Sequence, residues 1–109
     1  MNTLELSKAI DSSDAAAPAT PCAPPFFAVG TAYFFRTVTY HLVGRIARIE
    51  GRFIILADAA WVADSGRWAQ ALSTGVLNEV EPYPGEVAVN LDTVTDACRW
   101  SHALPLVQK

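Results

Sequence analysis

The chain has 109 residues, a net charge of −3, and 51% apolar against 17% charged residues. This balance excludes a wholly disordered chain and favours one small globular domain that buries surface, in part against partners. The acidic balance argues against a long nucleic acid duplex as partner, because proteins that bind one usually carry a basic patch. No run reaches the ~18 apolar residues of a membrane helix, so no membrane span is expected.

The first 29 residues are expected to form an arm in front of a domain at residues 30–109. The acidic start lacks the basic region of a secretory signal, so none is expected. Residues 15–25, AAAPATPCAPP, are rich in proline, which favours the extended polyproline conformation. Phe26 and Phe27 end the arm. We expect them to dock on this domain or on a neighbouring copy, since exposed aromatic pairs are costly.

From residue 30 onward the sequence favours a mainly β domain. Segments rich in β-branched and aromatic residues suit the pleated surface of a sheet. Gly44 stands inside the second segment, where a glycine predicts a bulge or a sharp bend. Two short turns, Glu50-Gly51 and Asp92-Thr93, should each join neighbouring strands. The five expected strands cover residues 32–41, 42–49, 52–62, 86–91 and 94–100.

One short helix is expected between the third and fourth strands, at residues 67–73. Ser65 precedes it as a candidate N-cap, and Gly75 follows it as a C-terminal stop. Residues 76–85 contain two prolines and are expected to form a loop. Trp68, Ala71 and Leu72 share one side of this helix, at i, i+3 and i+4 spacing.

This order of elements resembles the Sm-like small barrel, a strongly bent antiparallel sheet of five strands. The segments TVTYHLVGRIARIEGRFIILADAAWV and EVAVNLDTVTDACRW carry the likeness. The resemblance implies a small Sm-like or SH3-like barrel with one helix inserted between strands three and four. It also implies rings, because Sm-like barrels commonly assemble through their strand edges. RNA binding is not implied, since the RNA-binding loop signatures of these proteins are absent here.

The sequence also resembles, more closely, a family of small uncharacterised bacterial and phage-associated proteins. This likeness covers residues 31–109 and is carried by RTVTYHLVGR, DAAWVADSGR, LNEVEP and WSHALP. The family implies no activity. It does imply that residues 58–85 belong to the domain and are not an accidental insertion.

The sequence contains no recognisable catalytic motif. His41 could find Thr39 or Asp96 as a partner, but a strand-end histidine on the surface is the simpler interpretation. Cys22 and Cys98 form neither a CxxC motif nor a disulfide framework, so free thiols are expected. Four acids could share a cation only if they converge, and loop acids are usually solvated. These acids are Asp58, Asp64, Glu79 and Glu81. We therefore expect no enzyme activity, no cofactor and no metal.

Aromatic and arginine side chains serve either protein interfaces or nucleotide pockets. The candidate interface residues are Phe26, Phe27, Trp61, Trp68, Leu72, Leu77 and Tyr83. The candidate residues of a ligand pocket are Arg36, Tyr40, Arg45, Arg67 and Arg99. Arg45, Arg48 and Arg52 surround Glu50, and such a group usually forms a solvated hairpin face.

The sequence favours a cytoplasmic, non-enzymatic structural module whose partners are copies of itself. Open edge strands must be paired, covered or blunted, and head-to-tail pairing between copies gives rings, tubes or filaments. The alternative is a binder of small nucleotide-like ligands with sites at subunit interfaces, such as a phage sponge for immune signals. Neither a membrane nor a nucleic acid is an expected partner.

Overall fold

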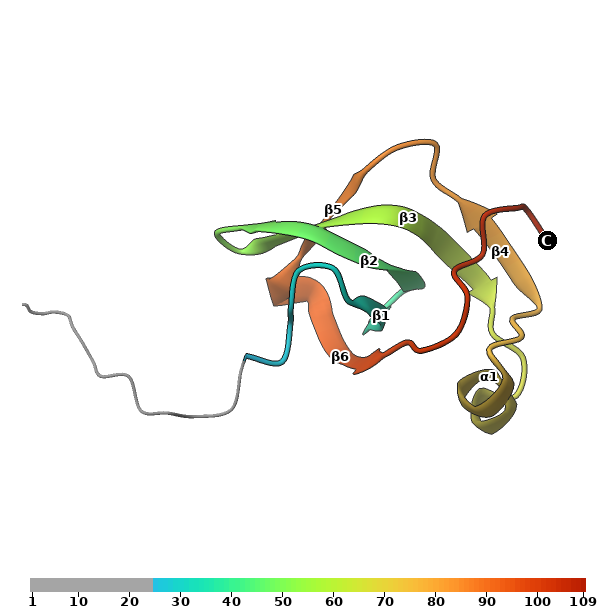
Figure 1. The fold of residues 1–109 in the computed structure, drawn as a ribbon. Coiled ribbons are helices and arrows are strands. Elements are labelled where there is room, and N and C mark those ends of the chain that lie inside the picture. Colours follow the sequence, from blue (N-terminus) through green and yellow to red (C-terminus); the bar gives the residue numbers. More distant parts are fainter. Residues whose placement is uncertain (1–24) are drawn as a thin grey trace, which may run out of the picture.

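The computed structural model describes residues 25–109. They form an antiparallel sheet of six strands with one helix, so the expected mainly β domain is confirmed (Figure 1). Most of the expected arm, including all but the last residue of its proline-rich stretch and Cys22, lies in residues 1–24, outside the described residues. The elements in chain order are β1 (Ala32–Thr37), β2 (His41–Glu50), β3 (Phe53–Asp64), α1 (Trp68–Thr74), β4 (Glu79–Pro82), β5 (Val87–Asn90), the 3-10 helix η1 (Leu91–Thr93) and β6 (Val94–Arg99).

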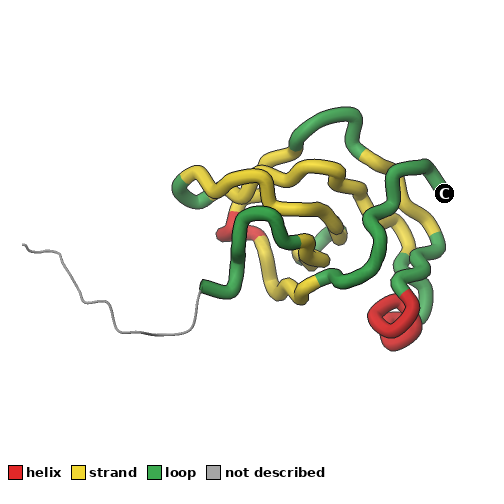
Figure 2. The backbone as a smooth tube through the Cα atoms, viewed as in Figure 1, coloured by secondary structure: helices red, strands yellow, loops and turns green. Residues whose placement is uncertain are grey.

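The sheet runs in the order β4-β3-β2-β1-β6, with β5 beside β3. Strands β4 and β5 lie along different halves of β3, which is the longest strand. Only η1 separates β5 from β6 along the chain, although these strands lie at the two ends of the sheet. The sheet therefore curls, which brings its two ends close together in space (Figure 2). Within residues 25–109 β5 and β6 are not paired with each other. The sheet is therefore open, and the expected closed barrel is not confirmed.

A bulge between β2 and β3 produces much of this curl. Val43 pairs with Ala60 and Arg45 with Ala57, so two residues of β3 lie opposite Gly44 alone. One of these two, Asp58, has a φ of 51°, in the left-handed region that few residues other than glycine adopt. The bend predicted from Gly44 in β2 is thus present, and the strained residue, Asp58, lies in the paired strand β3.

The two faces of the sheet carry separate hydrophobic cores. Val89 of β5 packs in the same cluster as Tyr33 and Phe35 of β1, although β2 and β3 separate these strands in the sheet. This face is therefore the concave one, and we call its cluster the inner core. On the other face, α1 and the segment after β6 cover the sheet. This outer core consists of Phe34, Val43, Ala60, Val62, Ala71, Leu77, Val80 and Trp100.

The first expected strand, 32–41, is wrong in its second half. A turn at residues 38–40 separates β1 from β2. The Thr37 hydroxyl holds it, because Thr37 Oγ1 donates to the Tyr40 carbonyl at 2.8 Å and accepts from the Tyr40 N–H at 3.1 Å. Val38 and Thr39 have high strand propensity, which concealed a turn made by a threonine side chain.

The expected loop at 76–85 contains a sixth strand, β4. It is short, acidic and ends in Pro82, features that are typical of an edge strand and weak as a sequence signal. The helix is displaced by one residue from the expected 67–73. Its N-cap residue is Arg67, and the Ser65 hydroxyl bonds to the Gly66 carbonyl instead of capping the helix. Gly75 ends the helix at a φ of 76°, as expected.

Candidate functional site

A shallow pocket lies where the β1–β2 turn, the end of β3 and the segment after β4 meet. It has a volume of about 430 Å³. We call it the aromatic pocket, and it is lined by Tyr40, Trp61, Glu81, Pro82, Tyr83 and Pro84.

Each wall of the aromatic pocket follows from local structure. The turn held by Thr37 presents Tyr40, whose side chain is 40% exposed. Trp61 is paired in register with Leu42 of the inner core on one side and with Glu81 on the other. The pocket therefore lies at the rim of the inner core, where Trp61 remains 37% exposed.

Tyr83 completes the pocket from the segment between β4 and β5. Its N–H donates to the Ala59 carbonyl at 2.9 Å, next to the bulge, and its ring packs against the inner core. Burial raises the pKa of the Tyr83 hydroxyl above its ordinary value, and nearby Tyr40 adds to the effect. Like an ordinary tyrosine, its hydroxyl is protonated at neutral pH and can donate a hydrogen bond.

The chemistry of the aromatic pocket suits binding. Three aromatic rings and two proline rings offer apolar walls, and the Glu81 carboxylate supplies one charge. Pockets of this kind bind flat or ridged apolar surfaces, with a few polar groups that fix orientation.

A second group of functional side chains lies at the edge of the outer core. Arg36 pairs in register with His41 of β2 and with Asp96 of β6, so the three form a row across the sheet. Arg36 Nε donates to Asp96 Oδ1 at 2.7 Å, and its guanidinium lies 5.2 Å from the centre of the Trp68 ring. The hydrogen bond from Arg36 holds the pKa of the Asp96 carboxyl below its ordinary value.

This row does not form the acid–base pair considered for His41. Asp96 binds Arg36, and the His41 ring packs 5.6 Å from the centre of the Phe34 ring. Cys98, two residues after Asp96, is a free thiol whose pKa is raised, first by burial and then by Asp96. In residues 25–109 no three His, Cys, Asp or Glu side chains come together as a metal site.

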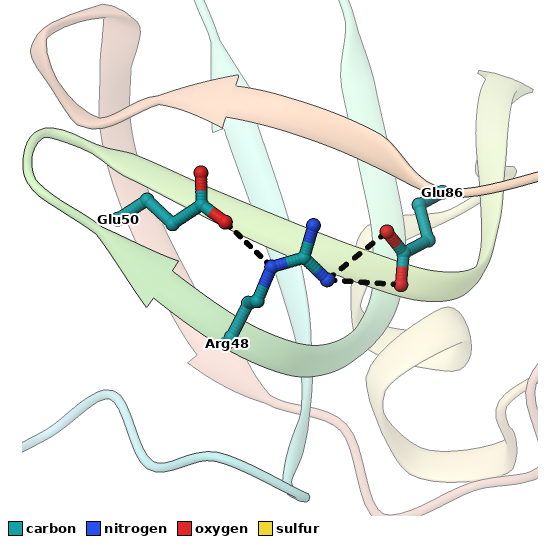
Figure 3. A network of polar contacts seen from close by, with 3 residues as sticks. All are labelled: Arg48, Glu50 and Glu86. Atoms are coloured by element: carbon teal, nitrogen blue, oxygen red, sulfur yellow. Dashed lines mark hydrogen bonds and ion pairs between the residues drawn. The ribbon is translucent and has the colours of Figure 1, made fainter.

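The hairpin arginines bind carboxylates instead of forming a basic patch. Arg48 bridges Glu50 and Glu86, with its Nη1 atom 3.1 Å from both Glu86 oxygens (Figure 3). Arg45 Nη1 donates to Asp58 Oδ2 at 2.8 Å, beside the bulge. Arg52 likewise binds Asp92. Exposed pairs of this kind contribute little to stability, but they leave no free cation at the hairpin.

The end of the arm docks on its own domain. The Phe27 ring stacks on Phe35 at 5.8 Å, in the inner core. The Tyr33 hydroxyl donates to the Phe26 carbonyl at 2.6 Å, and the Arg99 guanidinium lies 4.4 Å from the centre of the Phe26 ring. Both phenylalanines therefore contact the chain's own domain, which is one of the two docking places expected for them.

The remaining candidates are dispersed. Leu77 is only 4% exposed and belongs to the outer core, whereas Leu72 is 40% exposed on α1. Trp68 packs on Phe34 with ring centres 4.9 Å apart. Arg67 lines a separate hollow beside α1. The five ligand candidates thus do not converge within one copy. Of these five, only Tyr40 lines the aromatic pocket, together with Trp61 and Tyr83.

Sequence reasoning missed part of this surface. Glu81, Pro82 and Pro84 were assigned to a loop, although the alternation in Glu79-Val80-Glu81 is a strand signal. It also missed the covering of β4 by the C-terminal segment. The Lys109 and Val80 backbones exchange two hydrogen bonds, of 3.1 and 3.0 Å, along the outer edge of β4.

In the part of the chain that is described, no helix has the length and apolar character needed to cross a membrane. Comparisons with protein families, curated proteins and solved structures give no match for this chain.

Proposed function

We propose that the chain is a non-enzymatic module that assembles with copies of itself through the outer edges of β5 and β6. One observation carries this proposal. Within residues 25–109, β5 pairs only with β3 and β6 pairs only with β1, so each strand has an outer edge without a strand beside it. The outer edge of β4, in contrast, is covered by Lys109.

The alternation of backbone groups identifies the atoms on these edges. Trp100 donates its N–H to Ala32 of the β1 side, so the N–H groups of Ala97 and Arg99 point away from β1. Leu91 donates to Arg52 of the β3 side, so the N–H of Ala88 points away from β3. The β6 edge of one copy can pair with the β5 edge of the next, which is a head-to-tail contact.

A head-to-tail contact generates a ring if its rotation closes, and a tube or filament if it does not. The strand order also supports a variant of the small Sm-like or SH3-like barrel, in which the ends of the curled sheet approach each other without pairing. We propose a cytoplasmic setting as well, because Cys98 is a free thiol. The likeness to phage-associated proteins remains part of this proposal.

The test uses Ala97→Pro in the full chain, measured by light scattering after size exclusion. Proline removes the outward N–H of residue 97 and leaves the bonds to β1 intact, so assembly should be lost while the fold is kept. Ala97→Gly is the matched control, because it keeps the N–H and should still assemble. A wild-type chain that elutes as a monomer, or an Ala97→Pro variant that assembles normally while folded, would overturn the proposal.

The arrangement around Trp68 favours a second candidate, a small nucleotide-like ligand bound where copies meet. Arg36 lies over the partly exposed Trp68 ring, and Arg67 directly precedes Trp68 in the chain. Aromatic rings stack on bases, and arginine binds phosphate. The test is whether nucleotides raise the melting temperature of the protein. An increase that persists in Trp68→Phe and is lost in Arg67→Ala would support this candidate. No increase in the wild type would count against it.

A further inference from the structure

We infer that the aromatic pocket receives residues 18–24 of the arm of a neighbouring copy. This inference rests on the proposed self-assembly and names the contact that the arm makes in it. The aromatic pocket is the proposed binding site and the proline-rich arm is the proposed ligand. The position of Phe26 favours a contact between different copies.

The aromatic pocket matches a polyproline ligand. Ligands in the polyproline II conformation dock on aromatic-lined grooves, because their shape is largely formed before binding and little entropy is lost. Their backbone carbonyls have no internal hydrogen bonds and need donors. The indole N–H of Trp61 and the Tyr40 hydroxyl make no hydrogen bond within residues 25–109, and both residues are partly exposed in the pocket. The pocket therefore offers apolar walls together with donors.

The arm carries a matching proline pattern. Pro18, Pro21 and Pro24 recur every third residue. A polyproline II helix has three residues per turn, so in that conformation the three rings form one ridge. The residues between them are small, and no charged residue occurs from residue 15 to residue 35. The segment can therefore lie beside Glu81 without bringing a like charge close to it.

The base of the arm is held far from its own pocket. Phe26 packs on Tyr33 near the start of β1, with ring centres 5.5 Å apart, whereas Tyr40 follows the end of β1. Tyr33 and Thr37 are separated by about 13 Å, at 3.3 Å per residue. Pro24 precedes Phe26 by two residues, which span at most about 7 Å. In Figure 1 the first described residues, from residue 25, lie on the left of the domain, and β4 lies on the right. Tyr40 is therefore farther from Phe26 along β1 than Pro24 can reach, which favours the pocket of a neighbouring copy for the ridge as a whole.

The binding test uses a peptide of residues 15–27 with serine in place of Cys22. It is titrated into a full chain in which Pro18, Pro21 and Pro24 are alanine, which we call the arm variant. We expect saturable binding by calorimetry, and Trp61→Ala in the arm variant should weaken it by about thirty-fold, as for a central aromatic anchor.

Two controls accompany the titration. Ile49→Ala, at a residue about as exposed as Tyr40 but outside the pocket, should leave the affinity unchanged. A peptide of the same composition without the three-residue spacing should not bind. Circular dichroism confirms that each variant is folded. Absence of saturable binding, or binding that Trp61→Ala leaves intact, would overturn the inference.

A mixing experiment tests whether the contact joins two copies. The arm variant keeps the pocket and lacks the ridge, and Trp61→Ala in an otherwise native chain keeps the ridge and lacks the pocket. Each alone should associate less than the native chain, and mixing should restore association only if ridge and pocket belong to different copies. Association that is equal in the arm variant and the native chain would reject the neighbour's arm as occupant.

The two proposals fail in different ways. If the peptide does not bind but the native chain assembles and Ala97→Pro disrupts it, the edge contact stands and the arm contact is wrong. If the peptide binds at Trp61 but the native chain is a monomer at every concentration, the proposed self-assembly is wrong. The inference that the pocket binds the arm of a neighbouring copy is then wrong as well.

Discussion

Replacing Gly44 with alanine should destabilise the domain by about 1–3 kcal/mol, the usual effect of one methyl group added to a packed site. A Cβ at this position would lie 2.9 Å from the Ala59 Cβ, 3.1 Å from the Ala59 Cα and 3.2 Å from the Leu56 Cβ. None of these atoms is the end of a flexible side chain. Strand β2 would have to move away from the bulge in β3, which weakens the pairing that curls the sheet.

The matched control is Gly85→Ala, because a Cβ at Gly85 would meet nothing within 4 Å. It should change the free energy of unfolding by no more than about 0.5 kcal/mol. Thermal unfolding followed by circular dichroism measures both variants. A loss of 2 kcal/mol corresponds to a Tm lower by about 8–16 °C for a domain of this size. A Gly44→Ala variant that melts with the wild type would refute the link between this glycine and the bulge.

Three further predictions concern the docked arm, the free thiol and the ion pair on β1. Phe27→Ala should reduce the free energy of unfolding by about 1–3 kcal/mol, because the ring is partly buried in the inner core; unchanged stability would mean that the arm does not dock there. In a Cys22→Ser background, Cys98 should react with iodoacetamide more slowly than free cysteine at pH 8 and faster as the pH rises, because its pKa is raised; a rate equal to that of the unfolded chain would contradict this. Arg36 lowers the pKa of Asp96, so the pair stabilises the fold above the ordinary carboxyl pKa of about 4 and ceases to do so as the pH falls through the lowered value. The stability difference between wild type and Asp96→Asn should therefore shrink in acid, and a difference that grows in acid would contradict the sign.

The sequence predicted the elements whose signal is local. Alternating apolar residues located the long hairpin of β2 and β3, and Gly44 marked the bulge. The turn after Thr37 was missed because a side-chain hydroxyl makes it, whereas the residues within it favour strands. Strand β4 was missed because four residues with a terminal proline carry too little periodicity, and only pairing with β3 stabilises them.

The aromatic pocket shows the limit of sequence reasoning for a site. Trp61 and Tyr83 were both selected as interface anchors, but Tyr40 was assigned to a different, ligand-binding set. Their convergence depends on the register of β3 against β2 and β4 and on the turn before β2, none of which a single sequence specifies. Leu77 illustrates the converse, since its apolar side chain fitted an interface equally well but is buried in the outer core.

Sedimentation velocity of the full chain over a range of concentrations tests the central claim of self-assembly most directly. The proposed pairing of the β5 and β6 edges predicts species larger than the 11.8 kDa chain, whose proportion grows with concentration and falls in Ala97→Pro. A single species of monomer size at every concentration would contradict it.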